Sequence, residues 1–161
     1  MKKRVEPVKI KSAVLREMGA PAPYAVSRPI RIETLELDPP GYGEVLVQMK
    51  AASLCHSDLS VVNGSRPRPL PMALGHEASG VVAAVGEGVA DLQPGDHVVC
   101  VFVPSCGHCI PCKEGRPALC EPGAASNTAG TLIGGGIRLH TPENESINHH
   151  LGISAFSEYA V

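Results

Sequence analysis

Four cysteines between residues 106 and 120 constrain this chain more than any other feature of its sequence. Cys106, Cys109 and Cys112 follow one another at intervals of three, and Cys120 comes after seven further residues. Neighbouring disulfides at this spacing would strain one another, whereas four thiolates around one tetrahedral ion need a tight loop and one return residue. A disulfide-bonded lobe of a secreted protein is the alternative. We expect no secretion signal, because the basic start is not followed by an apolar segment. The spacing therefore predicts a structural zinc lobe over about residues 104–122.

Length and composition limit the classes that remain. With 161 residues, the chain is long enough for one well-buried domain. Its net charge is −2 with both signs mixed, which argues against a nucleic-acid partner. Apolar stretches such as residues 81–85 are strand-sized and too short to cross a membrane. We therefore expect a soluble, cytoplasmic protein with neither a membrane nor a nucleic-acid partner.

The hydrophobic pattern predicts strands joined by many turns. Aromatic residues are scarce, whereas there are 17 glycines and 15 prolines. Alternating or short apolar runs give the expected strands, at residues 9–18, 30–37, 44–50, 78–85, 96–103 and 156–161. We expect a flexible tail at residues 1–7, a short helix opening at Cys55 and ending near Asn63, and irregular structure over 123–136. This order predicts a mainly β domain over residues 8–161, a small irregular β-barrel or sandwich with short helices.

One glycine pattern resembles a dinucleotide-binding turn but lacks its other parts. Gly86 and Gly88 follow an apolar strand, but Asp91 stands where the third glycine would be. Pro94 and Gly95 then prevent the helix whose N-terminus would bind a diphosphate. We therefore predict an ordinary turn between strands.

A second set of candidate metal ligands surrounds Cys55 and His76. Both residues are followed closely by carboxylates, Asp58 and Glu77 respectively. A catalytic zinc has about three protein ligands, and carboxylates commonly orient the ligating imidazole. Alone, a buried cysteine or a hydrogen-bonded core histidine is the commoner explanation for either residue. From the spacing alone, a second metal site and two ordinary core residues are about equally supported.

Taken together, these motifs resemble the N-terminal, GroES-like catalytic domain of the medium-chain zinc alcohol dehydrogenases. The resemblance covers about residues 10–161. It is carried by Cys55-His56-Ser57-Asp58, Gly75-His76-Glu77-Ala78-Ser79-Gly80, Gly95-Asp96-His97-Val98 and the four-cysteine lobe. The ending, His149-His150-Leu151-Gly152 with Phe156-Ser157-Glu158-Tyr159, resembles the liver-type branch, which includes glutathione-dependent formaldehyde dehydrogenases. The resemblance implies a GroES-like β-barrel with a protruding zinc lobe.

The resemblance also implies roles for individual residues. Cys55 and His76 would bind a catalytic zinc, and the four lobe cysteines a structural zinc. Asp58 would hold the imidazole of His76, with the carboxylate of Glu77 close behind the metal. Ser57 would take the proton of the alcohol, and His56 would lie near the cofactor diphosphate. The implied reaction is hydride transfer from a zinc-bound alkoxide to NAD, which oxidises a small alcohol to an aldehyde or ketone.

The chain departs from this family pattern in three respects. The family's third catalytic-zinc ligand, a cysteine, and its NAD-binding Rossmann domain would both come after Val161. Ser60 stands where some liver-type members have a histidine that extends the proton relay. Other polar residues have ordinary interpretations: Cys100 is expected to be buried in a strand, and His108, His140, His149 and His150 are expected on the surface or in packing.

Two functions follow as hypotheses. The first is the catalytic portion of a zinc- and NAD-dependent alcohol dehydrogenase, homo-oligomeric in its full-length form and inactive as this chain alone. The second is a zinc-stabilised GroES-like module without catalysis of its own. A portion of a related zinc polyol dehydrogenase shares the same motifs, but the liver-like ending disfavours it.

Overall fold

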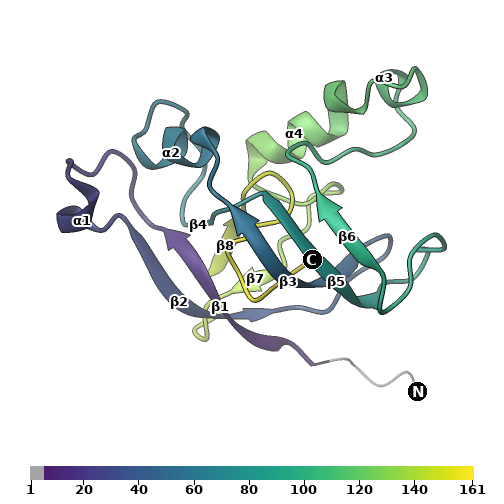
Figure 1. Ribbon diagram of the computed structural model, residues 1–161, viewed down its shortest axis with the longest axis horizontal. Helices are drawn as coiled ribbons and strands as arrows, with labels where there is room; N and C mark the ends of the chain where they lie inside the picture. The colour runs from purple at the N-terminus through teal and green to yellow at the C-terminus, as the bar shows by residue number, and fades with distance from the viewer. Residues whose placement is uncertain (1–5) are drawn as a thin grey trace.

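The computed structural model of this protein describes residues 6–161. Residues 1–5 of the expected tail lie outside the described part, and residues 6 and 7 precede the first strand without regular structure. In the described part, strands contribute most of the regular structure, and they form two sheets (Figure 1). The mainly β, barrel-like class predicted from the sequence is therefore confirmed.

The first sheet closes on itself as a barrel of five strands. In spatial order these are β1 (Val8–Leu15), β2 (Ile30–Leu37), β7 (Leu139–His140), β8 (Ser146–His149) and β4 (Met72–Ala73). The long pair β1 and β2 is antiparallel and in register over all eight positions, from Val8 opposite Leu37 to Leu15 opposite Ile30. Closure joins segments that lie far apart in the sequence, because β4 pairs with both β1 and β8.

The second sheet has four strands. Their spatial order is β6 (His97–Cys100), β5 (Glu77–Val85), β3 (Val45–Ser53) and β9 (Tyr159–Ala160). β3 and β5 pair over nearly their whole length, with two register shifts, after Leu46 and after Met49. Gly80 lets these strands pack closely, since a Cβ there would lie 2.5 Å from the Val47 side chain.

Alternating apolar residues of the barrel strands form the main core. Ile10 and Val14 of β1 pack with Leu35 and Leu37 of β2 and with Ile147 of β8, and all five are essentially buried. A second cluster lies under the short helix α2 (His56–Val62), where Val61 and Val62 meet Leu15, Met72 and Leu74. This packing fixes α2 against the end of the barrel, so the residues that begin this helix have a defined position.

The remaining helices are short. They are α1 (Tyr24–Ser27), α3 (Ile110–Lys113), a 3₁₀ turn (Pro117–Leu119) and α4 (Glu121–Ala129). The prediction of irregular structure over 123–136 was wrong for its first half, because α4 continues to Ala129. Pro122 suits the first turn of a helix, the Cys120 thiol accepts the N–H of Gly123, and Gly130 ends the helix at φ 72°.

Several predicted boundaries were close, but β1 ends at Leu15 rather than at residue 18, and the predicted strand 156–161 has only Tyr159–Ala160 in β9. β2 occupies the predicted residues 30–37, and α2 ends just before Asn63 as expected. β6 is shorter than the predicted 96–103, because the chain leaves the sheet after Cys100 towards the cysteine lobe. β4, β7 and β8 were not predicted, since strands of two to four residues give no periodic signal. Within residues 6–161, no helix has the length and apolar character needed to span a bilayer.

Candidate metal centres

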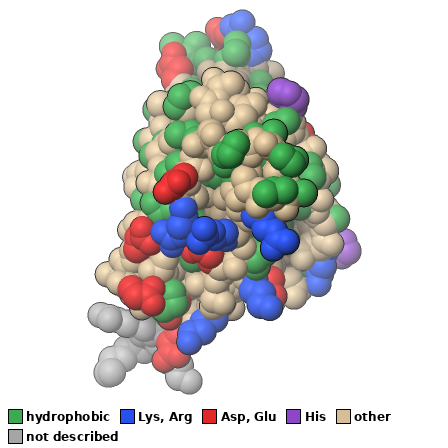
Figure 2. All heavy atoms as spheres, turned by 90° about the vertical axis from the view of Figure 1, so that its left-hand side faces the viewer, with side chains coloured by type: hydrophobic (Ala, Val, Ile, Leu, Met, Phe, Trp, Pro, Cys, Tyr) green, Lys and Arg blue, Asp and Glu red, His purple; other side chains and the backbone are tan. Residues whose placement is uncertain are grey.

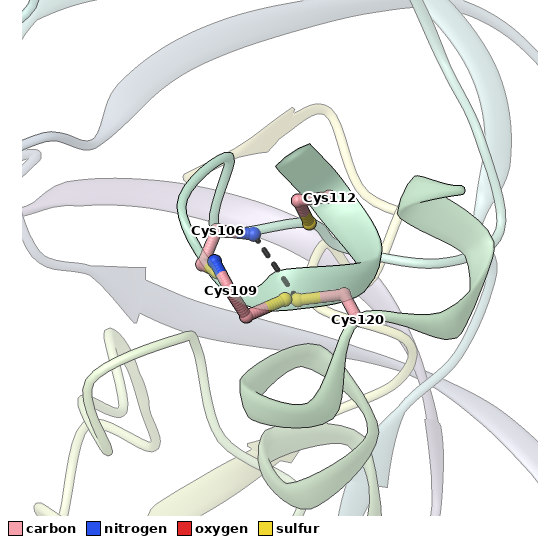
Figure 3. A group of neighbouring side chains, drawn as sticks. All are labelled: Cys106, Cys109, Cys112 and Cys120. Carbon is pink, nitrogen blue, oxygen red and sulfur yellow. Dashed lines mark hydrogen bonds between the residues drawn. The ribbon is translucent and has the colours of Figure 1, made fainter. Parts of the chain in front are cut away.

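The four cysteines of the predicted lobe converge on one point. Cys106 lies in the loop after β6, Cys109 and Cys112 flank the start of α3, and Cys120 precedes α4. Their side chains point toward one another from three successive turns of the chain (Figure 3). The four sulfur atoms lie within 4.8 Å of one another, and all four are free thiols.

Backbone N–H groups around the lobe point at these sulfur atoms. The N–H of Cys106 donates to Sγ of Cys120 at 3.2 Å, that of Cys109 to Sγ of Cys106 at 3.3 Å, and that of Gly123 to Sγ of Cys120 at 3.3 Å. Such donors favour a negatively charged sulfur. Backbone donation from His108 lowers the pKa of the Cys106 thiol to about 6. Burial, with the neighbouring thiol of Cys109, raises the pKa of Cys112 to about 12.

This donor set fits a zinc ion. Four sulfur ligands at tetrahedral spacing are typical of structural zinc, and a bound cation would make ionisation of all four thiols favourable. Gly123 packs against the carbonyl of Pro104 so closely that no side chain fits there, which holds α4 against the start of the lobe. The cysteine lobe is therefore built from local turns and anchored at both of its ends.

A second cluster of candidate ligands lies at the junction of α2 and β5. Cys55 is the residue before α2, His76 lies between β4 and β5, and Glu77 is the first residue of β5. One ligand atom from each of these three residues lies within 4.8 Å of the other two. The structure therefore brings together Cys55 and His76, which the sequence separates by about 20 positions, and adds a carboxylate to the pair. We refer to these three residues as the Cys55 cluster.

Ser57 adjoins the Cys55 cluster through its hydroxyl. Its Oγ lies 3.1 Å from Nε2 of His76. Hydrogen bonding from Ser57, ahead of that from His76, lowers the pKa of the Cys55 thiol. The carboxylate of Glu77 accepts a 2.7 Å hydrogen bond from the hydroxyl of Ser53 on the neighbouring strand β3. A thiol of lowered pKa, an imidazole nitrogen and a carboxylate suit a divalent zinc ion.

The buried carboxylate of Asp58 connects α2 to the Cys55 cluster. Its Oδ2 accepts the N–H of Cys55 at 3.1 Å, which satisfies a backbone donor at the start of the helix. Its Oδ1 accepts the N–H of Gly75 at 3.2 Å and lies 3.3 Å from Nδ1 of His76. Burial alone would raise the pKa of Asp58, but its contacts with the rings of His150 and His76 and with the N–H of Cys55 outweigh burial and lower it. The carboxylate is therefore ionised and faces the ring nitrogen of His76 that points away from Ser57.

The imidazole of His76 is fully buried, and its surroundings act on its charge in opposite directions. Desolvation by burial lowers its pKa, but interactions with Asp58 and Cys55 exceed this effect, so the net direction is upward. Its ring also makes an edge contact with Phe102, at 6.3 Å between ring centres. His76 is thus held by a carboxylate on one side and an aromatic ring on another.

The last of the predicted site residues, His56, lies at the surface. His56 is exposed at the first position of α2, with Nδ1 3.4 Å from the hydroxyl of Ser60. It lines an open cavity of about 640 Å³ together with Cys55, Arg28 and apolar residues of α1 and α2. A second open cavity, of about 600 Å³, is lined by Glu77 and by Val99, Val101 and Phe102 around β6. Figure 2 views the side of the molecule that carries α1, and it shows hydrophobic side chains gathered above a band of charged ones.

The histidines and the cysteine given ordinary interpretations have mixed outcomes. Cys100 is only half-buried in β6, because this edge strand leaves one face open. His108 is exposed in the lobe, His140 is half-buried, and His149 and His150 are buried. His150 was expected on the surface or in packing; it is buried, and its Nδ1 lies 3.1 Å from Oδ1 of Asp58. No local sequence signal could have revealed this contact, since the two residues meet only when the barrel closes.

Comparison with known proteins places this geometry in a family. The model of the alcohol dehydrogenase GroES-like domain matches residues 41–161. A solved structure of an alcohol dehydrogenase zinc-binding domain protein from Burkholderia ambifaria is 38% identical with a TM-score of 0.85. The match covers 96% of this chain and 40% of that one. Benzyl alcohol dehydrogenase from Acinetobacter calcoaceticus is 35% identical with a TM-score of 0.79, and the match covers 95% and 38% of the two chains.

A more distant solved structure was determined with cobalt and zinc bound. A cobalt- and zinc-bound thermostable alcohol dehydrogenase from Pyrobaculum aerophilum is 28% identical, with a TM-score of 0.66 and coverage of 95% of this chain and 39% of that one. The match to this chain therefore spans about two fifths of the length of each of these three structures. From the match over residues 41–161 and the shared fold, the chain belongs to the alcohol dehydrogenase GroES-like domain family.

Proposed function

We propose that this chain is the catalytic-domain portion of a zinc- and NAD-dependent alcohol dehydrogenase that interconverts alcohols with aldehydes or ketones. The observation that carries the proposal is the Cys55 cluster, with the hydroxyl of Ser57 at its edge. Family membership supports it, as do solved alcohol dehydrogenases with the same fold. Because the chain spans only part of those structures, the activity belongs to a protein that also carries a cofactor-binding domain.

In this proposal, Cys55 and His76 hold a catalytic zinc with the carboxylate of Glu77 close behind it, and the four cysteines of the lobe hold a structural zinc. The catalytic zinc would supply Lewis acidity toward the substrate oxygen, and NAD would accept the hydride. The carboxylate of Glu77 lies close enough to the other two ligand atoms to contact the same ion while the third ligand is not in place. We propose that a cysteine beyond Val161 completes the site in the longer protein, as the family resemblance implies.

The chain's own residues would bind the substrate and move its proton. The hydroxyl of Ser57 lies beside the ligand-facing nitrogen of His76, so we assign it the proton of the alcohol. Asp58 keeps the proton of His76 on Nδ1 and so leaves Nε2 free to act as a ligand. His56 and Arg28 line one cavity, and this exposed pair supports binding of the cofactor diphosphate.

The residues that line the same cavity indicate which class of substrate it would accept. Besides Cys55 and His56, its walls include Tyr24, Leu54, Leu59 and Phe156, which present mainly apolar surface. We propose that it accepts small alcohols with an apolar chain or an aromatic ring. We also assign the chain to the liver-type branch, on the basis of its His149-His150-Leu151-Gly152 ending. We further propose that the longer protein is cytoplasmic and homo-oligomeric.

The test is NAD reduction with zinc supplied, using ethanol and benzyl alcohol as substrates. It compares this chain with a longer chain that carries a cofactor-binding domain after Val161. We expect turnover only by the longer chain, faster with benzyl alcohol, and a fall of at least about 100-fold on Ser57→Ala or His76→Ala. Ser65→Ala is the matched control, because this hydroxyl lies beyond the end of α2. Absence of turnover by the longer chain would favour the module without catalysis.

A further inference from the structure

The barrel places a second histidine against the carboxylate that faces His76. His150 follows β8 directly and is 2% exposed. Its Nδ1 lies 3.1 Å from Oδ1 of Asp58, the same oxygen that lies 3.3 Å from Nδ1 of His76. The two rings also meet edge to face, with their centres 5.2 Å apart and their planes at 85°. One carboxylate oxygen therefore faces two buried imidazoles.

Neither ring nitrogen has another partner. Nδ1 of His76 and Nδ1 of His150 are both buried without a regular hydrogen bond, and the polar group that each of them faces is Oδ1 of Asp58, at 3.3 and 3.1 Å. A buried polar atom without a partner costs stability, so a histidine that served only to fill space would be a poor choice here. Leu or Phe would fill a similar volume without this cost. The geometry thus gives the His150 ring a polar role directed at Asp58.

Local backbone bonds fix the position of His150. Its N–H donates to the hydroxyl of Ser154 at 3.1 Å, and its carbonyl accepts the N–H of Ser154 at 3.2 Å. The turn between them contains two non-glycine residues with positive φ, Leu151 at 51° and Ser154 at 58°. The fold maintains this costly conformation, and as a result the ring is carried on a rigid support.

We infer that His150 is a positioning residue of the catalytic metal centre, which holds the Asp58 carboxylate against His76. The inference rests on the proposed function. Asp58 can point its Oδ1 at His76 only while that oxygen is kept in the barrel interior, where Gly75 and His150 face it. The other oxygen, Oδ2, is bound to the start of α2. With an apolar residue at position 150, the carboxylate loses one of its inner contacts, and the hold of Asp58 on the His76 ring is weakened.

The functional consequence concerns the state of His76. When Asp58 holds the proton on Nδ1, the lone pair of the His76 ring is on Nε2. This is the nitrogen that lies beside the hydroxyl of Ser57. Loosening Asp58 lets the other tautomer compete, and that tautomer cannot bind a metal through Nε2. Loss of such an indirect partner typically lowers metal affinity by about 10- to 100-fold.

The experiment compares His150→Phe with His150→Asn. Phe retains the ring and removes the donor, whereas Asn places an amide N–H close to the position of Nδ1. His150→Met serves as a second apolar variant if the larger ring does not pack. In the metal-free chain, ¹⁵N NMR of the imidazoles reports the tautomer of His76. We expect the Nδ1–H form in the parent chain, a mixture in the Phe and Met variants, and recovery in the Asn variant.

Metal binding provides the second readout. Each chain is first loaded with one zinc equivalent, which the cysteine lobe takes up, and urea unfolding checks that the barrel of each variant is folded. It is then titrated with Co²⁺. We expect the second equivalent to bind about 10- to 100-fold more weakly in the Phe and Met variants and within about threefold of the parent in the Asn variant.

The two readouts separate this inference from the proposed function. If the parent chain binds no second metal, the proposed metal centre fails, and the tautomer of His76 still decides the role of His150. An unchanged tautomer in His150→Phe and His150→Met overturns the inference, as does an Asn variant as impaired as the Phe variant. A third metal equivalent in the parent that is lost in every variant would make His150 a ligand and would equally overturn it.

Discussion

The cysteine lobe and the Cys55 cluster each bring several candidate metal ligands together, but they take these residues from different parts of the chain. In the lobe, four sulfur atoms converge within fifteen residues, through turns that need little support from the barrel. The Cys55 cluster takes its residues from the start of α2 and the start of β5, and its inner contacts from a turn after β8. The first arrangement is a property of a short peptide, whereas the second exists only when the barrel has closed. The two candidate metal centres should therefore respond differently to the same disturbance.

The largest expected effect comes from removing one lobe cysteine. We expect Cys109→Ser to lose one zinc equivalent and to expose residues 104–122 to proteolysis, because structural zinc contributes on the order of 10 kcal/mol in small sites. The barrel should remain folded, since its core clusters lie outside the lobe. Elemental analysis and limited proteolysis measure both effects. Cys100→Ser is the control, and equal zinc loss in that variant would contradict the assignment.

A glycine substitution should have the opposite pattern: it should impair the Cys55 cluster and leave the cysteine lobe intact. A Cβ on Gly75 would lie 2.5 Å from the backbone nitrogen of Phe156, and its φ is 91°. We expect Gly75→Ala to cost roughly 3–5 kcal/mol of unfolding free energy and to abolish the second metal equivalent, while the lobe keeps its zinc. Urea unfolding and Co²⁺ titration measure this.

The matched control for this glycine lies in the lobe. Gly107 has φ 77° with no atom near its missing Cβ. Gly107→Ala should therefore cost only about 1–2 kcal/mol and leave the second metal equivalent in place. If both alanine variants were equally destabilised, crowding at Gly75 would not be what supports the Cys55 cluster.

The barrel has a pH response of its own, which metal-free protein should reveal. His149 is fully buried in β8 and accepts the N–H of Arg138, and burial lowers its pKa from 6.5 to about 4. Below pH 6.5 the unfolded chain binds a proton that the folded chain binds only near pH 4. Stability is thus intact above pH 6.5 and falls as the pH drops toward 4, by roughly 3 kcal/mol in total.

Urea unfolding of the metal-free chain between pH 7.5 and 4 measures this loss. His149→Gln retains an acceptor for Arg138 and removes the titration, so its stability should fall less steeply over the same range. A slope identical to that of the parent chain would show that another group is responsible for the acid sensitivity.

The smallest expected effects come from two ion pairs, one beside the barrel strands and one in the lobe. Arg138 and Glu44 form two parallel contacts, of 2.8 and 3.2 Å, and both side chains are at least partly buried. In the lobe, Arg116 and Glu114 form an ion pair in which both side chains are exposed to solvent. We expect Arg138→Gln to cost about 1 kcal/mol and Arg116→Gln less than about 0.5 kcal/mol. Thermal unfolding in low and high salt tests this order, and a larger effect in the lobe would reverse it.

The same contrast explains how far sequence reasoning could reach. The strand at Ile30–Leu37 was predicted to the residue because its alternation is local, and the lobe cysteines were grouped correctly because their spacing is local. The helix after Cys120 was missed because its residues are small and its stop signal, Gly130, was interpreted as part of a loop. A Pro after a capping residue, followed by Gly eight positions later, could have indicated it.

Contacts made by closure of the barrel could not be predicted in the same way. Cys55, His76 and Glu77 were grouped as candidates from motif order and the family resemblance, but their approach in space depends on the packing of α2 and on the pairing of β3 with β5. The contact of His150 with Asp58 depends on the turn that follows β8. The short strands β4 and β8, which close the barrel, carry no periodicity of their own, so the sequence gives no local signal for such contacts.

The two oxygens of the Asp58 carboxylate make different contacts, and this affects how variant libraries should be interpreted. One oxygen completes the first turn of α2, and the other faces His76, so a single substitution changes protein abundance and site chemistry at once. Selections scored by growth would count every change at this position as harmful without distinguishing the cause. A swap to Asn keeps one acceptor, and the orientation of its amide would determine which of the two tasks survives. Position 58 is thus one at which folding and function share a single evolutionary constraint.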